Sequence, residues 1–180
     1  KILGNIGRHN EKAEIFEKVV KADPVKRANE VKIEIEEFLT LKEIATKMYR
    51  MQKVGGLQLR VTHNDTKCNN VLFDSINHNY LCVIDLDTIM PGLVGFDFGD
   101  AVRFAANTSA EDETDLKKVE LDLNKFEAIT KGFISKAGSS LTEQEIQTLS
   151  LGAITMTIEC GLRFLTDYLD GDNYFKIDYD

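Results

Sequence analysis

The spacing of apolar residues predicts a helical first third for this chain. In residues 10–22, NEKAEIFEKVVKA, the apolar positions fall on one face of a helix. Asp23 and Pro24 then offer an N-cap and a first-turn proline, so a second helix is predicted over residues 24–51. Its apolar face is broad, as in helices that pack into a core, and Gly55-Gly56 is expected to end it.

The middle of the chain changes to short, strand-like apolar runs. Three such runs cover residues 57–62, 71–73 and 81–84. Residues 74–79, DSINHN, are dense in turn formers and separate the last two runs. The sequence therefore predicts a β-hairpin at the centre of the chain.

Helical patterns return after the hairpin. One helix is predicted over residues 96–106 and is followed by an acidic, polar loop at residues 107–115. Thr142 and Glu145 form a capping box that opens a long apolar helix ending near Leu169. The expected fold class is α+β, mostly helical, with one short central hairpin.

Composition narrows the class of protein. With 180 residues, 43% hydrophobic and 29% charged, residues 1–180 suit one globular domain. A net charge of −8 argues against nucleic acid as a partner, and no apolar run approaches the ~20 residues of a membrane helix. The three cysteines form no CxxC pair, so we expect free thiols, no structural zinc and a cytoplasmic location.

Candidate chemistry is concentrated in residues 62–87. His63-Asn64-Asp65 followed by Asn70 fits the pattern H-x-D-x-x-x-x-N. In phosphoryl transfer the aspartate orients the acceptor hydroxyl and takes its proton, while the asparagine offers an amide oxygen to Mg²⁺. A motif of only three fixed positions is weakly specific, so the prediction of a phosphotransferase site needs further support from the predicted hairpin.

The predicted hairpin brings two Mg²⁺ ligands together. Asn70 precedes its first strand and Asp85 follows its second, and the two ends of an antiparallel pair lie side by side. An amide oxygen and a carboxylate suit Mg²⁺, with ATP phosphates completing the coordination. Asp87 is expected on the same face as Asp85, as a ligand of a second metal, a group positioning metal-bound water, or a surface charge.

Several neighbouring residues allow two interpretations. His63 braces the loop through Asp85 or a backbone carbonyl, or takes part in the chemistry directly. Lys67 attracts a phosphate of the nucleotide or is simply solvated. Asp97-Phe98-Gly99 spells the metal-binding triplet of protein kinases but opens a helix beyond the hairpin, so Asp97 is expected to be an N-cap that hydrogen-bonds back to the loop. Arg103 is expected to form a structural salt bridge.

The segment 62–87 resembles the aminoglycoside phosphotransferase and choline kinase superfamily, with Asn64 in place of the usual Gly. The longer strings RVTHNDTKCNNVLFD, CVIDLDTIMPGLVGFDFGDAVRF and ECGLRFLTDYLDGDNYF are similar to the N-acetylhexosamine 1-kinases. The resemblance implies an ATP- and Mg²⁺-dependent enzyme that phosphorylates the anomeric hydroxyl of an amino sugar. It implies these roles: Asp65 as catalytic base, Asn70 and Asp85 as Mg²⁺ ligands, Asp87 as an accessory carboxylate, and Arg163 and Tyr174 as sugar contacts.

The resemblance also implies a protein-kinase-like C-terminal lobe without its ATP-binding N-terminal lobe. Nothing before Asp65 resembles the nucleotide-covering loop or the strand lysine of such kinases. We therefore expect the chain to need its own N-terminal lobe as partner and to transfer phosphate poorly alone. Two alternatives stay open: another small-molecule kinase of the superfamily (aminoglycoside, choline or homoserine type), and a catalytically silent, kinase-like binding module.

Overall fold

The computed structural model describes residues 5–111 and 113–175 of the predicted unit 1–180 and leaves its two ends and residue 112 outside. Helices dominate these residues, which confirms the mostly helical α+β class. The α-helices are α1 (Asn5–Ala22), α2 (Lys32–Lys53), α3 (Val94–Ala105), α4 (Leu123–Ala137), α5 (Glu143–Gln147) and α6 (Leu149–Asp170). Short 3₁₀ turns are η1 (Cys68–Asn70), η2 (Leu86–Thr88), η3 (Leu116–Lys118) and η4 (Gly138–Ser140). None of the described helices is long and apolar enough to cross a membrane.

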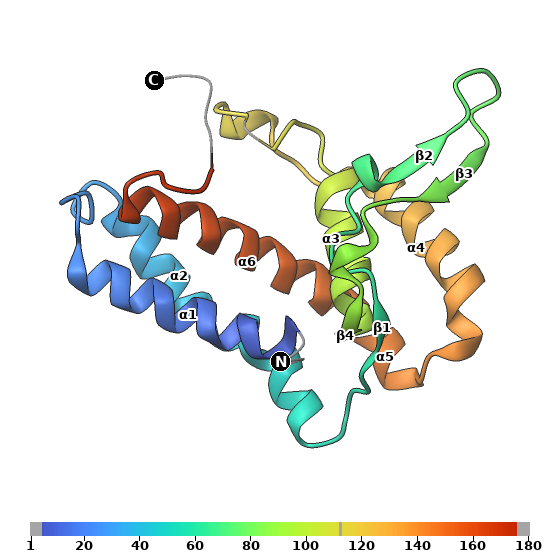
Figure 1. The fold of residues 1–180 in the computed structure, drawn as a ribbon, viewed down its shortest axis with the longest axis horizontal. Helices are drawn as coiled ribbons and strands as arrows, with labels where there is room; N and C mark the ends of the chain where they lie inside the picture. The colour runs from blue at the N-terminus through green and yellow to red at the C-terminus, as the bar shows by residue number, and fades with distance from the viewer. Residues whose placement is uncertain (1–4, 112, 176–180) are drawn as a thin grey trace.

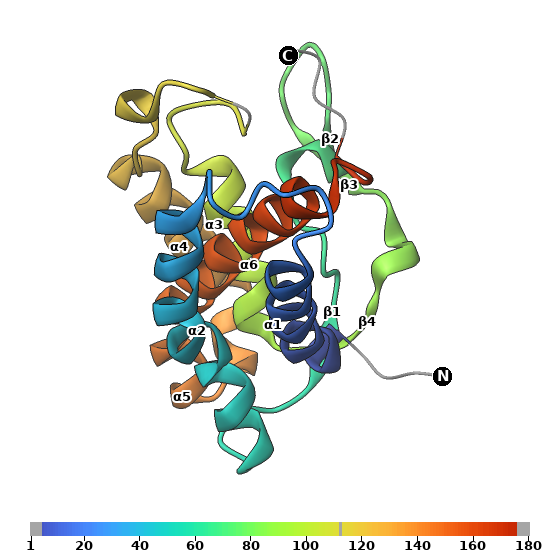
Figure 2. The same cartoon turned by 90° about the vertical axis from the view of Figure 1, so that its left-hand side faces the viewer.

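Helix α6 is the element around which the others pack. It contacts α1, α2 and α3, and α4 packs on the far side of α3 (Figures 1 and 2). Three clusters of buried side chains fill these contacts: Phe16, Ile35, Leu165 and Leu169; Phe98, Val102, Ala106 and Leu149; and Met48, Leu57, Leu93 and Phe96.

Glycines bring α3 and α6 unusually close together. A Cβ placed on Gly152 of α6 would lie 2.0 Å from the carbonyl oxygen of Gly95, and one on Gly99 of α3 would lie 2.3 Å from the carbonyl oxygen of Gly152. Real Cβ atoms do not approach backbone so closely, so any larger residue would force the helices apart. The position of α3 against the bundle therefore depends on these small residues.

Two short antiparallel strand pairs lie next to the helices. The predicted hairpin is confirmed as β2 (Val71–Phe73) and β3 (Tyr80–Val83), with Val71 opposite Val83. It projects from the helical body (Figure 1). The strand β1 (Arg60–Thr62) pairs with β4 (Met90–Gly92), with Arg60 opposite Gly92. The sequence pattern did not predict β4, because Pro91 and Gly92 are typical of a turn.

The second helix begins later than predicted. Asp23 and Lys26 have backbone φ angles of 41° and 62°, which a helix cannot contain, so Asp23 and Pro24 form a turn and α2 begins at Lys32. The turn is held by Arg27, which donates to the carbonyl of Tyr168 at 3.0 Å and to Asp172 at 2.5 Å. The prediction failed because these anchors lie far away in the sequence.

The long C-terminal helix is divided at Thr148. The capping box is confirmed, since Thr142 and Glu145 exchange both side-chain bonds at the start of α5. At Thr148 the ψ angle is 3°, and the hydroxyl donates to the carbonyl of Gln144 at 2.9 Å, so α5 ends there and α6 begins at Leu149.

Candidate active site

A carboxylate on α3 holds the backbone of residues 63–70, called the 63–70 loop below. Asp97 accepts hydrogen bonds from the backbone N–H of His63 and of Asn64, both at 2.8 Å. The expected link from Asp97 to the loop is thus confirmed, but its expected N-cap role is wrong: α3 begins at Val94, with Leu93 in the cap position. Burial raises the pKa of the Asp97 carboxyl group.

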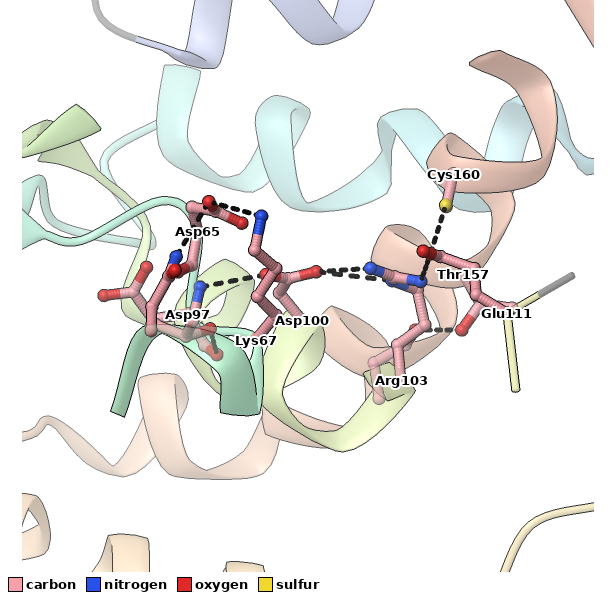
Figure 3. A network of polar contacts seen from close by, with 11 residues as sticks. Asp65, Lys67, Asp97, Asp100, Arg103, Glu111, Thr157 and Cys160 are labelled. Carbon is pink, nitrogen blue, oxygen red and sulfur yellow. Dashed lines mark hydrogen bonds and ion pairs between the residues drawn. The ribbon is translucent and has the colours of Figure 1, made fainter. Parts of the chain in front are cut away.

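Asp100 is a second anchor of this loop, one that the sequence pattern did not reveal. Its carboxylate accepts from the backbone N–H of Thr66 at 2.9 Å and pairs with Arg103 at 3.0 Å. Arg103 also pairs with Glu111 at 2.5 Å, and the Cys160 thiol donates to the same Glu111 (Figure 3). Arg103 forms the structural salt bridge expected of it, and the acidic residue three positions before it was the available signal for Asp100.

Within the loop, the predicted base and the first predicted metal ligand are in contact. The Asn70 amide nitrogen donates to the carboxylate and to the backbone carbonyl of Asp65, each at 2.8 Å. Lys67 lies 3.1 Å from the same carboxylate (Figure 3). Asn70 is buried while Asp65 and Lys67 are partly exposed, so the Asp65 carboxylate is held by an amide and a cation at the protein surface.

The hairpin places Asn70 beside the segment that carries Asp85 and Asp87. The N–H of Ile84 donates to the carbonyl of Asn70 at 2.9 Å, which continues the hairpin pairing by one step. The next residue, Asp85, has a φ of 62° and turns the chain out of the extended conformation into η2. The convergence of Asn70 and Asp85 predicted from the hairpin register is therefore observed in the backbone.

Asp85 is affected by its neighbour Asp87. A hydrogen bond with Asp87 and the charge of Asp87 raise the pKa of Asp85, with smaller contributions from burial and from Asp65. No group of three or more His, Cys, Asp and Glu side chains among the described residues could hold a metal alone. Two adjacent carboxylates beside an amide form an oxygen-rich site that suits Mg²⁺ when a nucleotide supplies further oxygen ligands.

His63 contacts a backbone carbonyl on the opposite arm of the hairpin. Its Nε2 lies 3.0 Å from the carbonyl oxygen of Ile84. A carbonyl only accepts hydrogen bonds, so this ring nitrogen carries the proton. This is the contact expected if His63 braces the loop, and it joins the loop to the residue before Asp85.

Arg163 and Tyr174 lie together at the end of α6. The Arg163 guanidinium is 5.6 Å from the Tyr174 ring centre and 5.4 Å from that of Phe175. The buried Asp167 carboxylate accepts the backbone N–H of Tyr174 at 2.8 Å and so fixes the chain after α6. The structure brings these two predicted sugar contacts together, with Tyr174 70% exposed.

A separate groove between α1, α2 and α6 contains none of these residues. Its lining is largely apolar and includes Phe16, Phe38 and Leu162. Ion pairs join its helices, from Lys42 to Glu17 and from Lys12 to Glu159. It belongs to the packing of the helical bundle and lacks the groups that the candidate chemistry needs.

In a comparison with protein families, residues 4–123 match the model described as the phosphotransferase enzyme family, APH. The matched range covers two thirds of the chain. It includes the 63–70 loop, both strand pairs and the anchors on α3, and it ends before Arg163 and Tyr174.

Proposed function

Since the chain belongs to this phosphotransferase family, we propose that it forms the catalytic lobe of an ATP-dependent small-molecule kinase. The observation that carries the proposal is the contact of Asp65 with Asn70, formed where the hairpin brings Asp85 and Asp87 alongside. A base, an amide oxygen and two carboxylates within one small region are the groups that phosphoryl transfer to a hydroxyl requires.

In this proposal Asp65 positions the acceptor hydroxyl and takes its proton as the phosphoryl group is transferred. The bond from the Asn70 amide nitrogen fixes the direction of that carboxylate. Lys67 lies 3.1 Å from this carboxylate and offers a positive charge to a nucleotide phosphate. The Asn70 amide oxygen, Asp85 and Asp87 would hold Mg²⁺, which when bound neutralises charge on the phosphates.

The acceptor we propose is the anomeric hydroxyl of an N-acetylhexosamine, giving a sugar 1-phosphate. Support comes from the sequence resemblance and from the pairing of Arg163 with the exposed ring of Tyr174. An aromatic face and a guanidinium suit the apolar face and the hydroxyls of a sugar. Aminoglycoside, choline or homoserine acceptors are the alternatives, and the absence of tryptophan argues against an aromatic cage for a quaternary ammonium group.

We further propose that an N-terminal lobe of the same protein covers the hairpin and brings the ATP, and that the protein works in the cytoplasm. Both hairpin strands expose large apolar side chains: Leu72, Phe73, Tyr80, Leu81 and Val83. Apolar surface gathered on two neighbouring strands is typical of a face that packs against another structural unit. Without that unit, the 180-residue chain is expected to transfer phosphate poorly.

Phosphorus NMR of the protein with both lobes, in the presence of ATP, Mg²⁺ and N-acetylglucosamine, tests the proposal. We expect a new sugar 1-phosphate resonance. Asp65→Asn keeps the shape of the side chain but removes the base, so kcat should fall by about 10²–10⁴-fold. Asp74→Asn is the matched control, because it removes the same charge from the hairpin turn, where an asparagine can keep the bonds to Ile76 and Asn77.

Each outcome has a distinct meaning. Product formation that is lost in Asp65→Asn and kept in Asp74→Asn supports both the reaction and the base. Transfer to another alcohol but to no N-acetylhexosamine would reject the sugar and keep the kinase. No transfer to any acceptor would favour the silent binding module, although Asp65, Asn70 and Asp85 are all intact.

A further inference from the structure

Asn64, the residue before the proposed base, has an unusual backbone conformation. Its φ angle is 63°, in the left-handed region that few side chains other than asparagine and aspartate tolerate. Its N–H donates to Asp97 at 2.8 Å. The left-handed turn directs the Asn64 side chain toward the strand pair β1–β4 and away from the surface of the loop.

The Asn64 amide uses both its nitrogen and its oxygen. The nitrogen donates to the carbonyl of Thr62 at 3.1 Å and to the carbonyl of Thr88 at 3.0 Å. The Thr62 hydroxyl lies 3.0 Å from the amide oxygen. Gly92 leaves room for this arrangement, since a Cβ there would lie 2.2 Å from that hydroxyl and 2.8 Å from the amide oxygen.

These contacts give residues 84–88, called the 84–88 segment, a second attachment to the 63–70 loop. His63 binds the carbonyl of Ile84, just before Asp85, and Asn64 binds the carbonyl of Thr88, just after Asp87. Two consecutive residues of the loop thus hold both ends of the segment that carries the two carboxylates. The Asn64 bond holds the Thr88 end of the segment directly, two residues before the pairing of β4 with β1 begins at Met90.

We propose that Asn64 is a positioning residue that fixes Asp85 and Asp87 relative to Asp65, and so sets the affinity of the site for its divalent cation. This inference rests on the proposed function, since it assigns the 84–88 segment to the cation. Residues that orient metal ligands through hydrogen bonds commonly change metal affinity by about 10–100-fold when they are replaced. Asn64 acts through the Thr88 carbonyl, because its amide nitrogen is used by the carbonyls of Thr62 and Thr88.

Asn64→Gly, made in the protein with both lobes, removes the side-chain bonds from Asn64 to the carbonyls of Thr62 and Thr88. Glycine adopts the same φ and keeps the N–H bond to Asp97, so the substitution removes the amide and little else. We expect Mn²⁺, titrated by electron paramagnetic resonance with a non-hydrolysable ATP analogue, to bind roughly 10-fold more weakly. We also expect kcat to fall and to recover in part at high Mg²⁺, with KM for the acceptor unchanged.

Two further variants make the test specific. Asn79→Gly changes an exposed asparagine of the hairpin turn and should leave Mn²⁺ binding and kcat at their original values. Thr62→Val removes the hydroxyl that lies 3.0 Å from the Asn64 amide oxygen and 2.9 Å from the Met90 carbonyl oxygen, keeps the shape of the side chain, and should weaken Mn²⁺ binding by a smaller factor. It also serves as the informative variant if Asn64→Gly does not fold.

A lower melting temperature in Asn64→Gly with unchanged Mn²⁺ affinity and kcat would reduce Asn64 to a structural role and overturn the inference. In that case the original protein still binds Mn²⁺ and transfers phosphate, so the proposed function stands. A protein with its original sequence that neither binds Mn²⁺ with the nucleotide analogue nor transfers phosphate would instead reject the proposed function and this inference together.

Discussion

At the scale of single residues, the candidate site depends on carboxylates that are not proposed to do chemistry. Asp97 and Asp100 accept three backbone N–H groups of the 63–70 loop, from His63, Asn64 and Thr66. Each such bond to a charged acceptor contributes about 1.5–3 kcal/mol. The loop conformation that directs Asp65 is therefore set from α3.

Asp97→Asn tests this support. The amide keeps one acceptor oxygen, so one of the two backbone bonds is lost, and we expect a loss of roughly 1–2 kcal/mol in the free energy of unfolding. Because the loop then shifts, kcat should fall about 10-fold or more, since misplaced catalytic groups lose effective molarity. Urea denaturation and steady-state kinetics measure the two effects.

The matched control is Asp122→Asn. Asp122 also accepts two backbone N–H groups, from Asn124 and Lys125 at the start of α4, away from the loop. It should lose little stability, because asparagine is also a good N-cap, and its kcat should not change. An Asp97→Asn protein that keeps the kcat of this control would contradict the proposed support.

Residue patterns revealed the candidate chemistry better than its support. The spacing of His63, Asp65 and Asn70 was visible in the sequence, and the hairpin register added Asp85. The bonds of Asp100 and Asn64 join residues 34 and 24 positions apart. They were not predicted because, unlike Asp97 in its Asp-Phe-Gly triplet, neither residue is a fixed position of a motif. The positive φ angle of Asn64 could not be predicted either, because the spacing of apolar residues carries no information about a single left-handed residue.

At the scale of elements, the crossing of α3 and α6 connects stability to the site. Gly152→Ala would place a Cβ 2.0 Å from the Gly95 carbonyl oxygen, so the two helices must separate. We expect the free energy of unfolding to fall by about 1–3 kcal/mol or more. Because α3 carries Asp97 and Asp100, kcat should fall as well, as chemical denaturation and kinetics would measure.

Gly132→Ala is the control for this change. A Cβ on Gly132 of α4 meets nothing within 4 Å, so alanine should stabilise that helix by about 0.5–1 kcal/mol. If both alanine variants raised stability equally, the close approach of α3 and α6 would have no energetic importance.

Helices and strands were predicted correctly where short-range sequence patterns determine them, and wrongly where distant contacts do. The hairpin β2–β3 and the capping box of α5 follow from short-range patterns, and both were predicted. The late start of α2 depends on Arg27 contacting residues 141 and 145 positions away. Strand β4 exists only because β1 pairs with it. Contacts of that range override local preference.

At the scale of the whole molecule, one ion pair joins the strands to the helical body. Arg60 on β1 donates two hydrogen bonds of 2.7 Å to Glu145 on α5, and only 2% of the Glu145 side chain is exposed. The Arg60 bond lowers the pKa of Glu145 from 4.5 to about 2, with further help from Thr142. The folded state therefore favours the ionised carboxylate.

This pKa predicts a loss of stability in acid. The folded-state pKa lies below that of the unfolded chain, so the stabilisation is complete above pH 4.5 and is lost as the pH falls toward 2. Urea midpoints of the original protein and of Glu145→Gln should therefore differ most at neutral pH and converge in acid. A difference that does not depend on pH would show that packing, and not charge, holds this contact.

The register of the two strand pairs has a consequence for how the site forms. Phe73 pairs with Tyr80, Val71 with Val83, Asn70 with Ile84, Asn64 with Thr88, Thr62 with Met90 and Arg60 with Gly92. These pairs are nested around the turn at residues 74–79. The two sheets are thus parts of one long, interrupted hairpin. The candidate site lies in the irregular stretch between the two strand pairs.

A nested hairpin can zip up from its tip, so each successive pair closes only a short additional loop at a small entropic cost. Strand pairing brings the two arms together, and the loop between them takes its final conformation when α3 supplies the carboxylates of Asp97 and Asp100. We therefore expect a two-residue turn in place of residues 74–79 to leave kcat unchanged, as steady-state kinetics would measure. One residue inserted into either arm would put every later pair out of step and separate the base from its metal ligands.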